Sequence, residues 1–377
     1  MKTSPRTCAG LLPASVVLLG LSATVAAAAF DSGSDGSYGP LTVTADTTLD
    51  LPPDGVLHCT TITVNQGRTL RFKKNPLNTP VVLLAQGDVT IAGVIDISGA
   101  NNSGAVGGAG GPGGFDGGHG GFGPSAPSSR GGDGHGPGAG VNAEGQRGGA
   151  YGTGSGANNR TYGNVLIVPM IGGSGASGIN GNPGSGGGGG GGAILIASNT
   201  RITVNGDINA RGGYGPYGGG SGGAVRLVAP TGGGNGNVRA DSLSNGGDGR
   251  VRVDTTDPLA FRNLSYQGAL TRGTRMFALP ATSPKLHFVS VAGQAIPVGA
   301  ASGVDFELPA GSPATQTVVL RGEGFTGNVP VRLVVTPENS ASTTYDLTLN
   351  AAANPPEVSA QITLTEGEPT RIAAWTR

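Results

Sequence analysis

The chain has little charge, few aromatic residues and few cysteines for its length. Only 12% of its 377 residues are charged, 5% are aromatic, and Cys occurs twice. The formal net charge is zero, so the sequence offers no electrostatic attraction for nucleic acid or for an anionic membrane surface. We therefore expect no nucleic-acid partner.

Long apolar runs are also scarce, and the main one lies near the N-terminus. Lys2 and Arg6 precede the run Leu11–Val25, and the small residues of "VAAAAF" follow it. This is the pattern of a secretory signal peptide, with cleavage near Ala29, rather than of a membrane anchor. No later segment approaches the roughly 20 apolar residues of a spanning helix. We expect residues 1–29 to be a signal peptide and the mature chain to be secreted or held at the cell surface.

The scarcity of cysteine excludes an intramolecular disulfide in the mature chain. Cys8 precedes the apolar run and leaves with the signal peptide, so that Cys59 remains alone. Cys59 lies in the alternating stretch "VLHCTTITV", where we expect a small buried side chain. The adjacent His58 would point to the opposite face of a strand, which argues against a catalytic Cys–His pair.

Glycine is abundant, with 74 residues, and it disfavours long helices because each helical Gly costs about 1 kcal/mol relative to Ala. An internal repeat indicates the alternative. Pro80–Gly99 and Ala193–Gly212 align without a gap, a third copy begins at Ala224, and an earlier one is visible in Cys59–Phe72. Repeats of about 20 residues with short apolar strands and tight corners are typical of a parallel β-helix.

The fold class expected is therefore all-β, with a right-handed parallel β-helix over residues 30–282. Equivalent residues of successive coils would stack about 4.8 Å apart, and the interior would be lined by Ile62, Ile91 and Ile202 or Val204. A β-sandwich is the competing architecture for this part. It would predict hairpins rather than copies that pair in register.

Residues 100–192 form a glycine-rich insertion between two copies of the repeat. Two alternatives remain open for it: a disordered loop, or a bundle of extended, polyproline-II-like Gly strands that pack beside the β-helix. Phe115, Phe122, Tyr151 and Tyr162 favour some packing, because a flexible tether needs no apolar anchors.

Three glycine motifs imitate catalytic or nucleotide-binding loops. The seven glycines within Gly184–Ser198 precede a strand, whereas a phosphate-binding loop follows a strand and opens a helix. Gly173, Gly175 and Gly178 match a dinucleotide motif, but "INGNPGSGG" follows and cannot be a helix. Ser221 in "GGSGG" precedes a strand instead of a helix. We expect no bound cofactor.

Acidic and histidine side chains in the insertion do not form a metal motif. Asp116, His119, Asp133 and His135 lie in "GGFDGGHGG" and "GGDGHGPGA". Neither segment fits the register of calcium-binding nonapeptides, and two His are too few for a zinc site. We expect adventitious binding of a divalent ion at most, and no metal site.

One polar face could serve a polysaccharide lyase or hydrolase. Stacking the repeats places Asp96, Asn209 and Arg239 in one column and Ser98, Arg211 and Asp241 in the next. Such an enzyme would use clustered acids or an Arg–Asp–Ca²⁺ group, and the residues it would have to bring together are Asp96, Asp207, Arg211, Arg239 and Asp241. The alternative is a solvated face of charge pairs, which we favour. We therefore expect no catalytic residues.

Composition changes after "FRNLSYQGAL", where glycine becomes rarer and alternating strands follow one another. The strands are "KLHFVSVAG", "VDFELPAG", "TQTVVLRGEGF", "VPVRLVVTP", "TTYDLTLN", "EVSAQITLTEG" and "TRIAAWTR". Their spacing predicts a C-terminal immunoglobulin-like β-sandwich over residues 283–377. We expect Trp375 to belong to its core.

The signal peptide is followed by "NTPVVLLAQGDVTIAGVIDISG", the insertion and "ITVNGDINARGG". In this order of features the chain resembles a family of uncharacterised secreted Gly-rich bacterial proteins. The resemblance covers nearly the whole chain and implies export, but no activity. More loosely, the glycine-rich part is similar to polyglycine-containing adhesins of bacteria and phages.

The expected function is that of an exported structural or adhesive protein without catalysis, with an extracellular polysaccharide or a surface protein as partner. The first alternative is the polysaccharide-active enzyme described above. The second alternative is a carbohydrate- or ice-binding module that uses a flat stacked face, for which the Thr columns ("TITV", Thr203) are short.

Overall fold

All regular elements of the described chain are β-strands, as the composition predicts. The computed structural model describes residues 29–122, 130–142, 145, 147–280, 284–297 and 304–376. No helix in this part of the chain is long and apolar enough to cross a membrane. The predicted signal peptide, apart from Ala29, and Cys8 lie outside the described residues.

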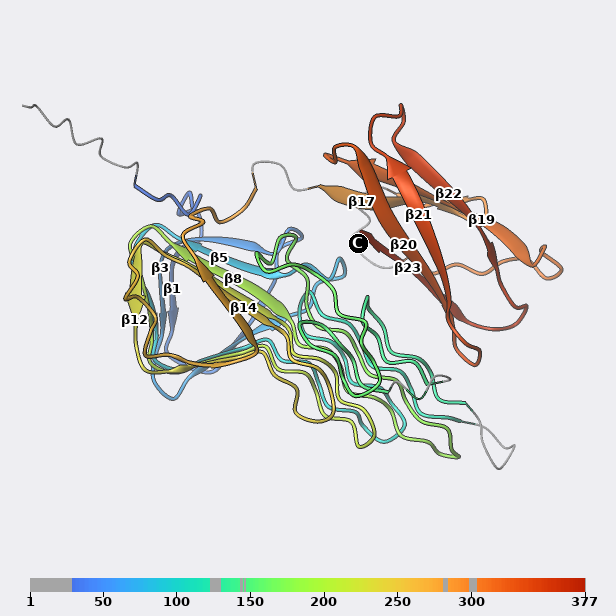
Figure 1. Ribbon diagram of the computed structural model, residues 1–377, viewed down its shortest axis with the longest axis horizontal. Coiled ribbons are helices and arrows are strands. Elements are labelled where there is room, and N and C mark those ends of the chain that lie inside the picture. The colour runs from blue at the N-terminus through green and yellow to red at the C-terminus, as the bar shows by residue number, and fades with distance from the viewer. Residues whose placement is uncertain are drawn as a thin grey trace, which may run out of the picture.

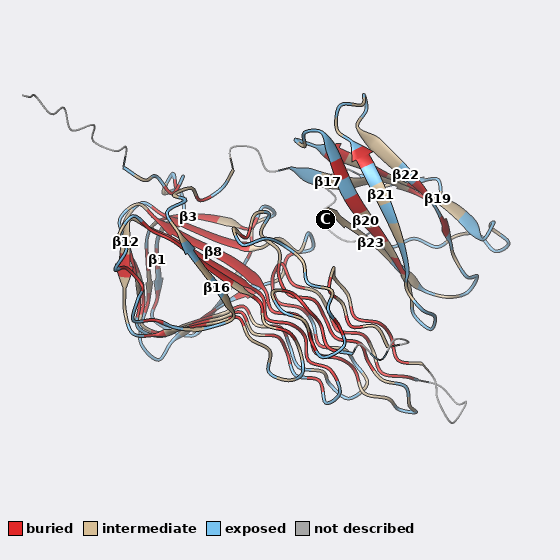
Figure 2. Cartoon of the chain, in the orientation of Figure 1, coloured by how far each residue is buried: buried red, intermediate tan, exposed pale blue. Residues whose placement is uncertain are grey.

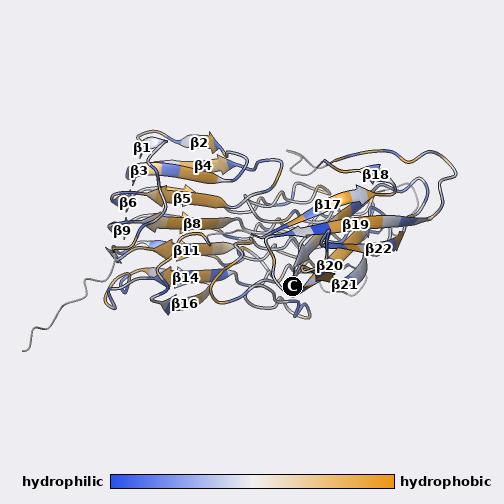
Figure 3. Cartoon of the chain, turned by 90° about the horizontal axis from the view of Figure 1, so that it is seen from above, coloured by the Kyte–Doolittle hydropathy of each residue, from blue (hydrophilic) through white to orange (hydrophobic). Residues whose placement is uncertain are grey.

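Two parallel sheets are built from residues 39–273 (Figure 1). The larger one has ten strands and curls into a half-barrel, in the order β12-β9-β6-β3-β5-β8-β11-β14-β16 with β1 beside β3, and the smaller one has six, in the order β15-β13-β10-β7-β4-β2. Figure 3 shows β3, β5, β8, β11, β14 and β16 stacked one above another. The strands are β1 (Gly39–Val43), β2 (Thr47–Asp50), β3 (Val56–Val64), β4 (Thr69–Lys73), β5 (Val81–Ala85), β6 (Val89–Ile91), β7 (Val94–Asp96), β8 (Ala193–Ser198), β9 (Arg201–Val204), β10 (Asp207–Asn209), β11 (Ala224–Val228), β12 (Thr231–Gly233), β13 (Asn237–Arg239), β14 (Arg250–Asp254), β15 (Ser265–Gln267) and β16 (Ala269–Gly273).

The strands of each repeat pair with the equivalent strands of the next repeat. The gapless alignment predicted this register, and the pairs Val81–Ile194, Val89–Ile202 and Val94–Asp207 confirm it. The third copy pairs as predicted too, because Ala224 lies opposite Ala193. Since side chains alternate between the two faces of a strand, this register keeps each apolar set on the inner face.

The core consists of apolar side chains stacked in rows between the sheets. Ile62, Ile91, Ile202 and Val204 are all fully buried, as predicted, and Cys59 is buried with them. Within a row, Ile62 pairs with Val89 rather than with Ile91. Ile91 instead lies opposite Val64. The inner residues are therefore the predicted ones, but Ile62 and Ile91 belong to different rows.

One end of the stack is closed by an aromatic side chain. Phe261 follows β14 in a turn, is fully buried, and adopts a left-handed backbone conformation with φ of 58°. Its ring lies where a side chain of Gly232 would be, only 2.1 Å from the ideal Cβ position. Gly232 is thus required for this ring to cover the end of the core.

The segment that precedes β1 runs across neighbouring repeats and ties them together. The Ser32 hydroxyl donates to the Ala85 carbonyl oxygen at 2.9 Å, and the Ser34 hydroxyl donates to the Cys59 carbonyl oxygen at 2.7 Å. The Ser32 backbone N–H donates to Asn199 Oδ1 at 2.6 Å. Three successive repeats are linked in this way through one short segment.

The described residues of 100–192, together with the loops 210–223 and 240–249, form a glycine lobe beside the parallel sheets. Its segments run as extended, wavy ribbons next to one another (Figure 1), and most of their glycines are buried (Figure 2). Hydrogen bonds join them although they lack regular strand pairing. Of the two alternatives for the insertion, the described part supports packed polyproline-II-like strands.

The seven glycines Gly186–Gly192 form a central strand of this lobe. Their N–H groups turn in rotation to three neighbouring segments, and the acceptors of residues 187 to 192 are the carbonyl oxygens of Gly118, Gly218, Ala100, Phe115, Ser221 and Ile97. A repeat of three residues per turn is that of polyproline II. Each of these glycines has backbone of another segment within 2.7 Å of its ideal Cβ position. The run is therefore a packed strand that leads into β8.

The C-terminal part consists of two antiparallel sheets that enclose a separate apolar core. One has the order β18-β17-β19-β22 and the other β21-β20-β23. The strands are β17 (Lys285–Val291), β18 (Gln294–Ala295), β19 (Thr315–Glu323), β20 (Asn328–Pro337), β21 (Thr343–Asn350), β22 (Glu357–Thr363) and β23 (Thr370–Thr376). Six of the predicted strands are present, but residues 304–311 form none.

The prediction for Trp375 is wrong, because this residue faces the glycine lobe. Ile372 and Ala374 contribute to the core of the C-terminal part, so that the alternation of β23 turns Trp375 outward. Its ring lies 6.5 Å from that of Phe115, centroid to centroid. Nearby, the Ser342 hydroxyl donates to Asp133 Oδ2 at 2.8 Å. The C-terminal part is thus attached to the lobe through specific contacts.

Candidate functional site

The polar residues that an enzyme would have to bring together lie on or directly after the six-stranded sheet. Asp96 ends β7, Asp207 begins β10 and Arg239 ends β13, while Arg211 and Asp241 follow the last two strands. Backbone pairing places Asn209 opposite both Asp96 and Arg239, as predicted from the repeat. All five candidates are partly exposed.

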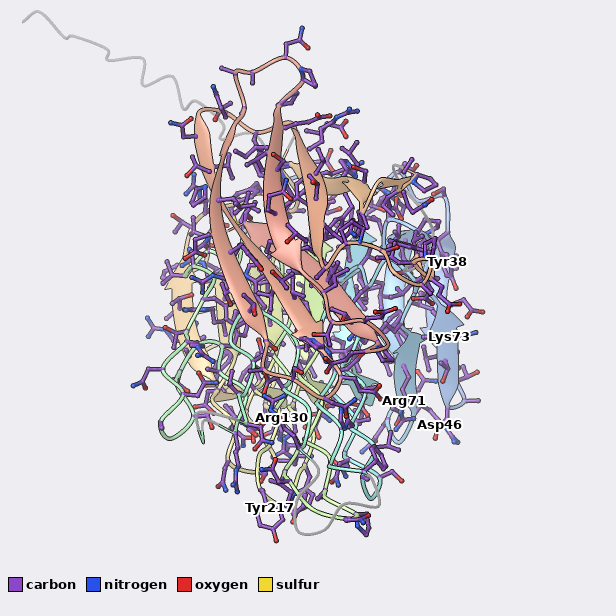
Figure 4. All side chains as sticks on the ribbon, turned by 90° about the vertical axis from the view of Figure 1, so that its right-hand side faces the viewer. Tyr38, Asp46, Arg71, Lys73, Arg130 and Tyr217 are labelled. Atoms are coloured by element: carbon purple, nitrogen blue, oxygen red, sulfur yellow. The ribbon has the colours of Figure 1, made fainter. Side chains whose placement is uncertain are left out.

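Each of these carboxylates is engaged by an arginine. The ion pairs have N–O distances of 2.7, 3.1 and 3.5 Å and join Arg211 to Asp241, Arg239 to Asp207 and Arg71 to Asp96. Arg71, labelled in Figure 4, is a partner that the sequence analysis missed. Its signal was its position on β4, directly opposite Asp96 in the register. The carboxylates of Asp241 and Asp207 also accept hydrogen bonds from their arginines. The face therefore forms a row of neutralised pairs.

Asp248 is a further carboxylate near this face that sequence reasoning missed. Burial raises the pKa of Asp248, and the negative charge of Asp241 raises it further. Its backbone N–H donates to Thr153 Oγ1 at 2.7 Å, which holds it against the glycine lobe. A carboxyl group with a raised pKa beside an ionised one is the arrangement that glycosidases use for general acid catalysis.

A row of threonines crosses the curled sheet. Thr42, Thr63, Thr90 and Thr203 lie directly opposite one another on β1, β3, β6 and β9. The row is longer than the sequence indicated, because the insertion separates its members along the chain. Its side chains are exposed or partly exposed, and the row ends at Gly233, opposite Thr203 on β12.

The predicted adventitious metal ligands lie where the glycine lobe meets the C-terminal part. Lys74 Nζ lies 3.0 Å from Asp116 Oδ1. Burial raises the pKa of Asp116, but Lys74, the Gly110 N–H and Arg371 outweigh it, so that the net pKa is lowered. His119 Nε2 contacts the Glu338 carbonyl oxygen at 2.9 Å. In the described part of the chain, no group of three or more His, Cys, Asp or Glu residues could hold a metal ion.

Ser221, the serine of the "GGSGG" motif that imitates a catalytic loop, lies inside the glycine lobe and is fully buried. Its hydroxyl accepts a hydrogen bond from the Ser174 N–H at 2.8 Å, and the Ser174 hydroxyl donates to Tyr162 Oη at 3.0 Å. Burial raises the pKa of Tyr162 well above its ordinary value. This group of hydroxyls therefore joins lobe segments and offers no accessible nucleophile.

A large cavity lies between the outer face of the parallel sheets and the C-terminal part. It has a volume of about 1860 Å³. Its walls are mainly apolar and include Val82, Leu195, Met170, Phe288 and Ile372. Residues 304–310, most of the predicted strand that does not form, contribute to the same wall. The polar row of arginine–aspartate pairs lies elsewhere, so that the cavity and the candidate acids do not form one site.

Comparison with protein-family models, with curated proteins and with solved structures finds no match for this chain. The resemblance to secreted glycine-rich proteins therefore remains a prediction.

Proposed function

We propose that the chain is an exported structural or adhesive protein of the cell surface or extracellular space, and that it acts by binding rather than by catalysis. In this proposal the parallel sheets are the walls of a right-handed parallel β-helix, residues 283–377 are an immunoglobulin-like β-sandwich, and the glycine lobe projects between them. An extracellular polysaccharide or a surface protein is its partner.

The β-helix assignment is supported by the pairing between repeats. β5, β6 and β7 follow one another along the chain, and they pair with β8, β9 and β10 in the same order. Those strands pair in turn with β11, β12 and β13. A chain that returns to the same three positions once per repeat is winding in coils.

The observation that carries the functional proposal is the construction of the glycine lobe. The N–H groups of Gly187–Gly192 each donate to the carbonyl oxygen of another segment, and side chains are excluded from the strand by backbone contact. Such a lobe offers a rigid platform for loops but no interior in which to bind a substrate. Rigid loops on a stable scaffold are suited to recognition, because little conformational entropy is lost on binding.

The test is retention of the chain from Phe30 onward on bacterial cells and on insoluble polysaccharides, together with an assay for released sugars. We expect retention without product. A second protein, lacking residues 100–192, separates the role of the lobe from that of the C-terminal part. Release of reducing or unsaturated ends would contradict the proposal, and so would the absence of binding to any surface.

The polysaccharide-active enzyme is the second candidate, and Asp248 is the observation in its favour. It would act as the general acid, with Asp241 as its ionised neighbour and Arg211 as the residue that holds Asp241. If this were the activity, Asp248→Asn would abolish product formation. The matched control is Asp50→Asn, which would leave most of the activity, because Asp50 lies on the edge strand β2 and pairs with Lys73.

The threonine row favours the other alternative, a carbohydrate- or ice-binding module. Four threonines spaced by one strand each give a flat polar line. Replacing Thr90 by Tyr would interrupt the line at its centre with a bulky ring. A loss of polysaccharide retention or of ice-growth inhibition in Thr90→Tyr, but not in Thr47→Tyr on β2, would establish this face as the binding surface.

A further inference from the structure

Three loops at the end of the glycine lobe lie side by side and have an unusual composition. They are residues 101–106 ("NNSGAV"), 213–218 ("GYGPYG") and 242–246 ("SLSNG"), which we call the loop-tip surface. None of these residues is charged. Tyr, Ser, Gly and Asn are also the residues that dominate antibody recognition loops, because Tyr offers a large amphipathic area at low entropic cost.

Hydrogen bonds hold the three loops together. The Asn102 N–H donates to the Tyr214 carbonyl oxygen at 2.9 Å, and the Tyr214 N–H donates to Asn101 Oδ1 at 2.8 Å. The third loop is joined to the second, because the Ser244 hydroxyl donates to the Gly215 carbonyl oxygen at 3.0 Å. The loops therefore form one continuous surface although they are far apart in the sequence.

The backbone beneath this surface is fixed by the glycine lobe. A Cβ atom on Gly213 would lie 1.9 Å from the Ala100 carbonyl oxygen, and one on Gly215 would lie 2.7 Å from the Gly188 nitrogen of the central strand. Such close packing leaves the backbone of the second loop little room to rearrange. Its side chains are thus presented in a geometry that is set before any partner arrives.

Large side chains on this surface point away from the protein. The exposed fractions are 46% for Tyr214 and 53% for Tyr217, and Val106 and Leu243 are also exposed. Figure 4 shows Tyr217 at the lower edge of the molecule, far from Tyr38. The Arg147 guanidinium lies 6.0 Å from the centre of the Tyr217 ring, which helps to hold the ring in place.

The chemistry of the surface indicates an uncharged partner with both apolar and hydroxyl-bearing faces. Aromatic rings accept the C–H face of a sugar. The Asn101 Nδ2 group can donate to a sugar hydroxyl and Asn102 Oδ1 can accept from one, while Asn101 Oδ1 and Asn102 Nδ2 form hydrogen bonds within the protein. The three loops themselves carry no cation, and the exposed Arg147 beside Tyr217 is engaged with that ring, so the surface lacks the cluster of cations that would favour an anionic polymer. A protein partner would favour a continuous apolar patch, whereas glycine and amide groups separate the rings here.

We propose that the loop-tip surface binds a neutral extracellular polysaccharide, with Tyr214 and Tyr217 as the residues that stack on its sugar rings. This inference rests on the proposed function, because it names the partner class and the surface of the binding protein. Asn101 and Asn102 supply the polar contacts, and the glycine lobe serves to hold the three loops in register.

The experiment is affinity electrophoresis of the chain from Phe30 onward in gels that contain amylopectin, xylan or galactomannan, with alginate and polygalacturonate as acidic comparisons. We expect retardation by at least one neutral polymer. The double substitution Tyr214→Ala and Tyr217→Ala should weaken it at least tenfold, and Tyr217→Phe should leave it nearly unchanged. Tyr38→Ala is the matched control, since Tyr38 is 45% exposed and lies outside the loop-tip surface.

Retardation by acidic polymers alone, or equal retardation of the double variant and the parent chain, overturns the inference. Binding to whole cells then separates the two proposals. If protease treatment of the cells abolishes binding while periodate treatment does not, the partner is a protein, and only the inference fails. If the chain binds neither cells nor polysaccharide, the proposed function fails as well. Unchanged circular dichroism and melting temperature of the double variant ensure that a loss reflects the surface.

Discussion

Replacing Gly190 by Ala should unfold the glycine lobe at a much lower denaturant concentration. Gly190 is buried in the central strand, and its ideal Cβ position lies 2.0 Å from the Gly173 carbonyl oxygen and 2.3 Å from the Gly173 carbonyl carbon. Ordinary contact begins at 3.4 Å, so the two segments must separate by about 1.4 Å. Because the obstacle is backbone rather than the end of a flexible side chain, no rotamer change can relieve it.

The magnitude follows from the hydrogen bonds that this separation breaks. Two hydrogen bonds join the segment of Gly173 to the central strand: the Gly173 N–H donates to the Gly191 carbonyl oxygen at 2.7 Å, and the Ala176 N–H donates to the Gly188 carbonyl oxygen at 3.0 Å. Each buried polar group that loses its partner costs about 1–3 kcal/mol. We therefore expect Gly190→Ala to lower the free energy of unfolding of the lobe by about 2–6 kcal/mol.

The assay is urea unfolding followed by fluorescence of Trp375, the only tryptophan of the chain, because its ring packs on Phe115 of the lobe. Gly233→Ala is the matched control. A Cβ atom there would approach only the end of the Arg201 side chain, at 3.1 Å, so we expect a change within about 1 kcal/mol. Equal unfolding midpoints for the two variants would refute the argument that backbone contact excludes side chains from the lobe.

Three further outcomes are expected. Asp254→Ala should destabilise the chain by about 3–5 kcal/mol in thermal unfolding, because the fully buried Asp254 carboxylate pairs with Arg226 and Arg252, and its loss leaves buried charge uncompensated. Burial lowers the pKa of His135 to about 4, below the unfolded value of about 6.5. Because the unfolded chain then binds a proton more readily, the free energy of unfolding should fall by about 2 kcal/mol between pH 7 and pH 5 and stay level above pH 7. In His135→Gln the fall should be smaller. Burial raises the pKa of the Cys59 thiol to about 11, so a disulfide reagent at pH 8 should react with it only after denaturation; rapid reaction of the native chain would contradict its burial.

Much of the parallel part could be predicted from sequence because two of its repeats align without a gap over 20 residues. Val81 and Ile194 occupy the same position in two copies, and a gapless alignment therefore gives their pairing directly. The burial of Cys59 followed from alternation on a strand. These successes have one physical origin, since side chains that alternate between inside and outside leave a periodic signal.

The glycine lobe left no such signal, because glycine has no side chain to alternate. Its order depends on backbone contacts between segments, such as Gly190 against Gly173, that no single segment encodes. The same limit applies to Asp248, whose raised pKa arises from burial against another loop. The prediction for Trp375 was wrong for a different reason. Alternation divides the residues of a strand between two faces, but it does not say which face packs in the core and which packs against another part of the protein.

The rotation of hydrogen bonds around Gly186–Gly192 has a consequence for the order of assembly. The central strand donates to residues 97–118, which precede it, and also to Gly218 and Ser221, which follow it along the chain. A chain that emerges N-terminus first cannot satisfy the donors of Gly188 and Gly191 until residue 221 has emerged. The hydrogen bonds of the lobe can therefore be completed only after β8 to β10 have been synthesised. Folding of this region depends on contacts between residues distant in sequence, which form slowly.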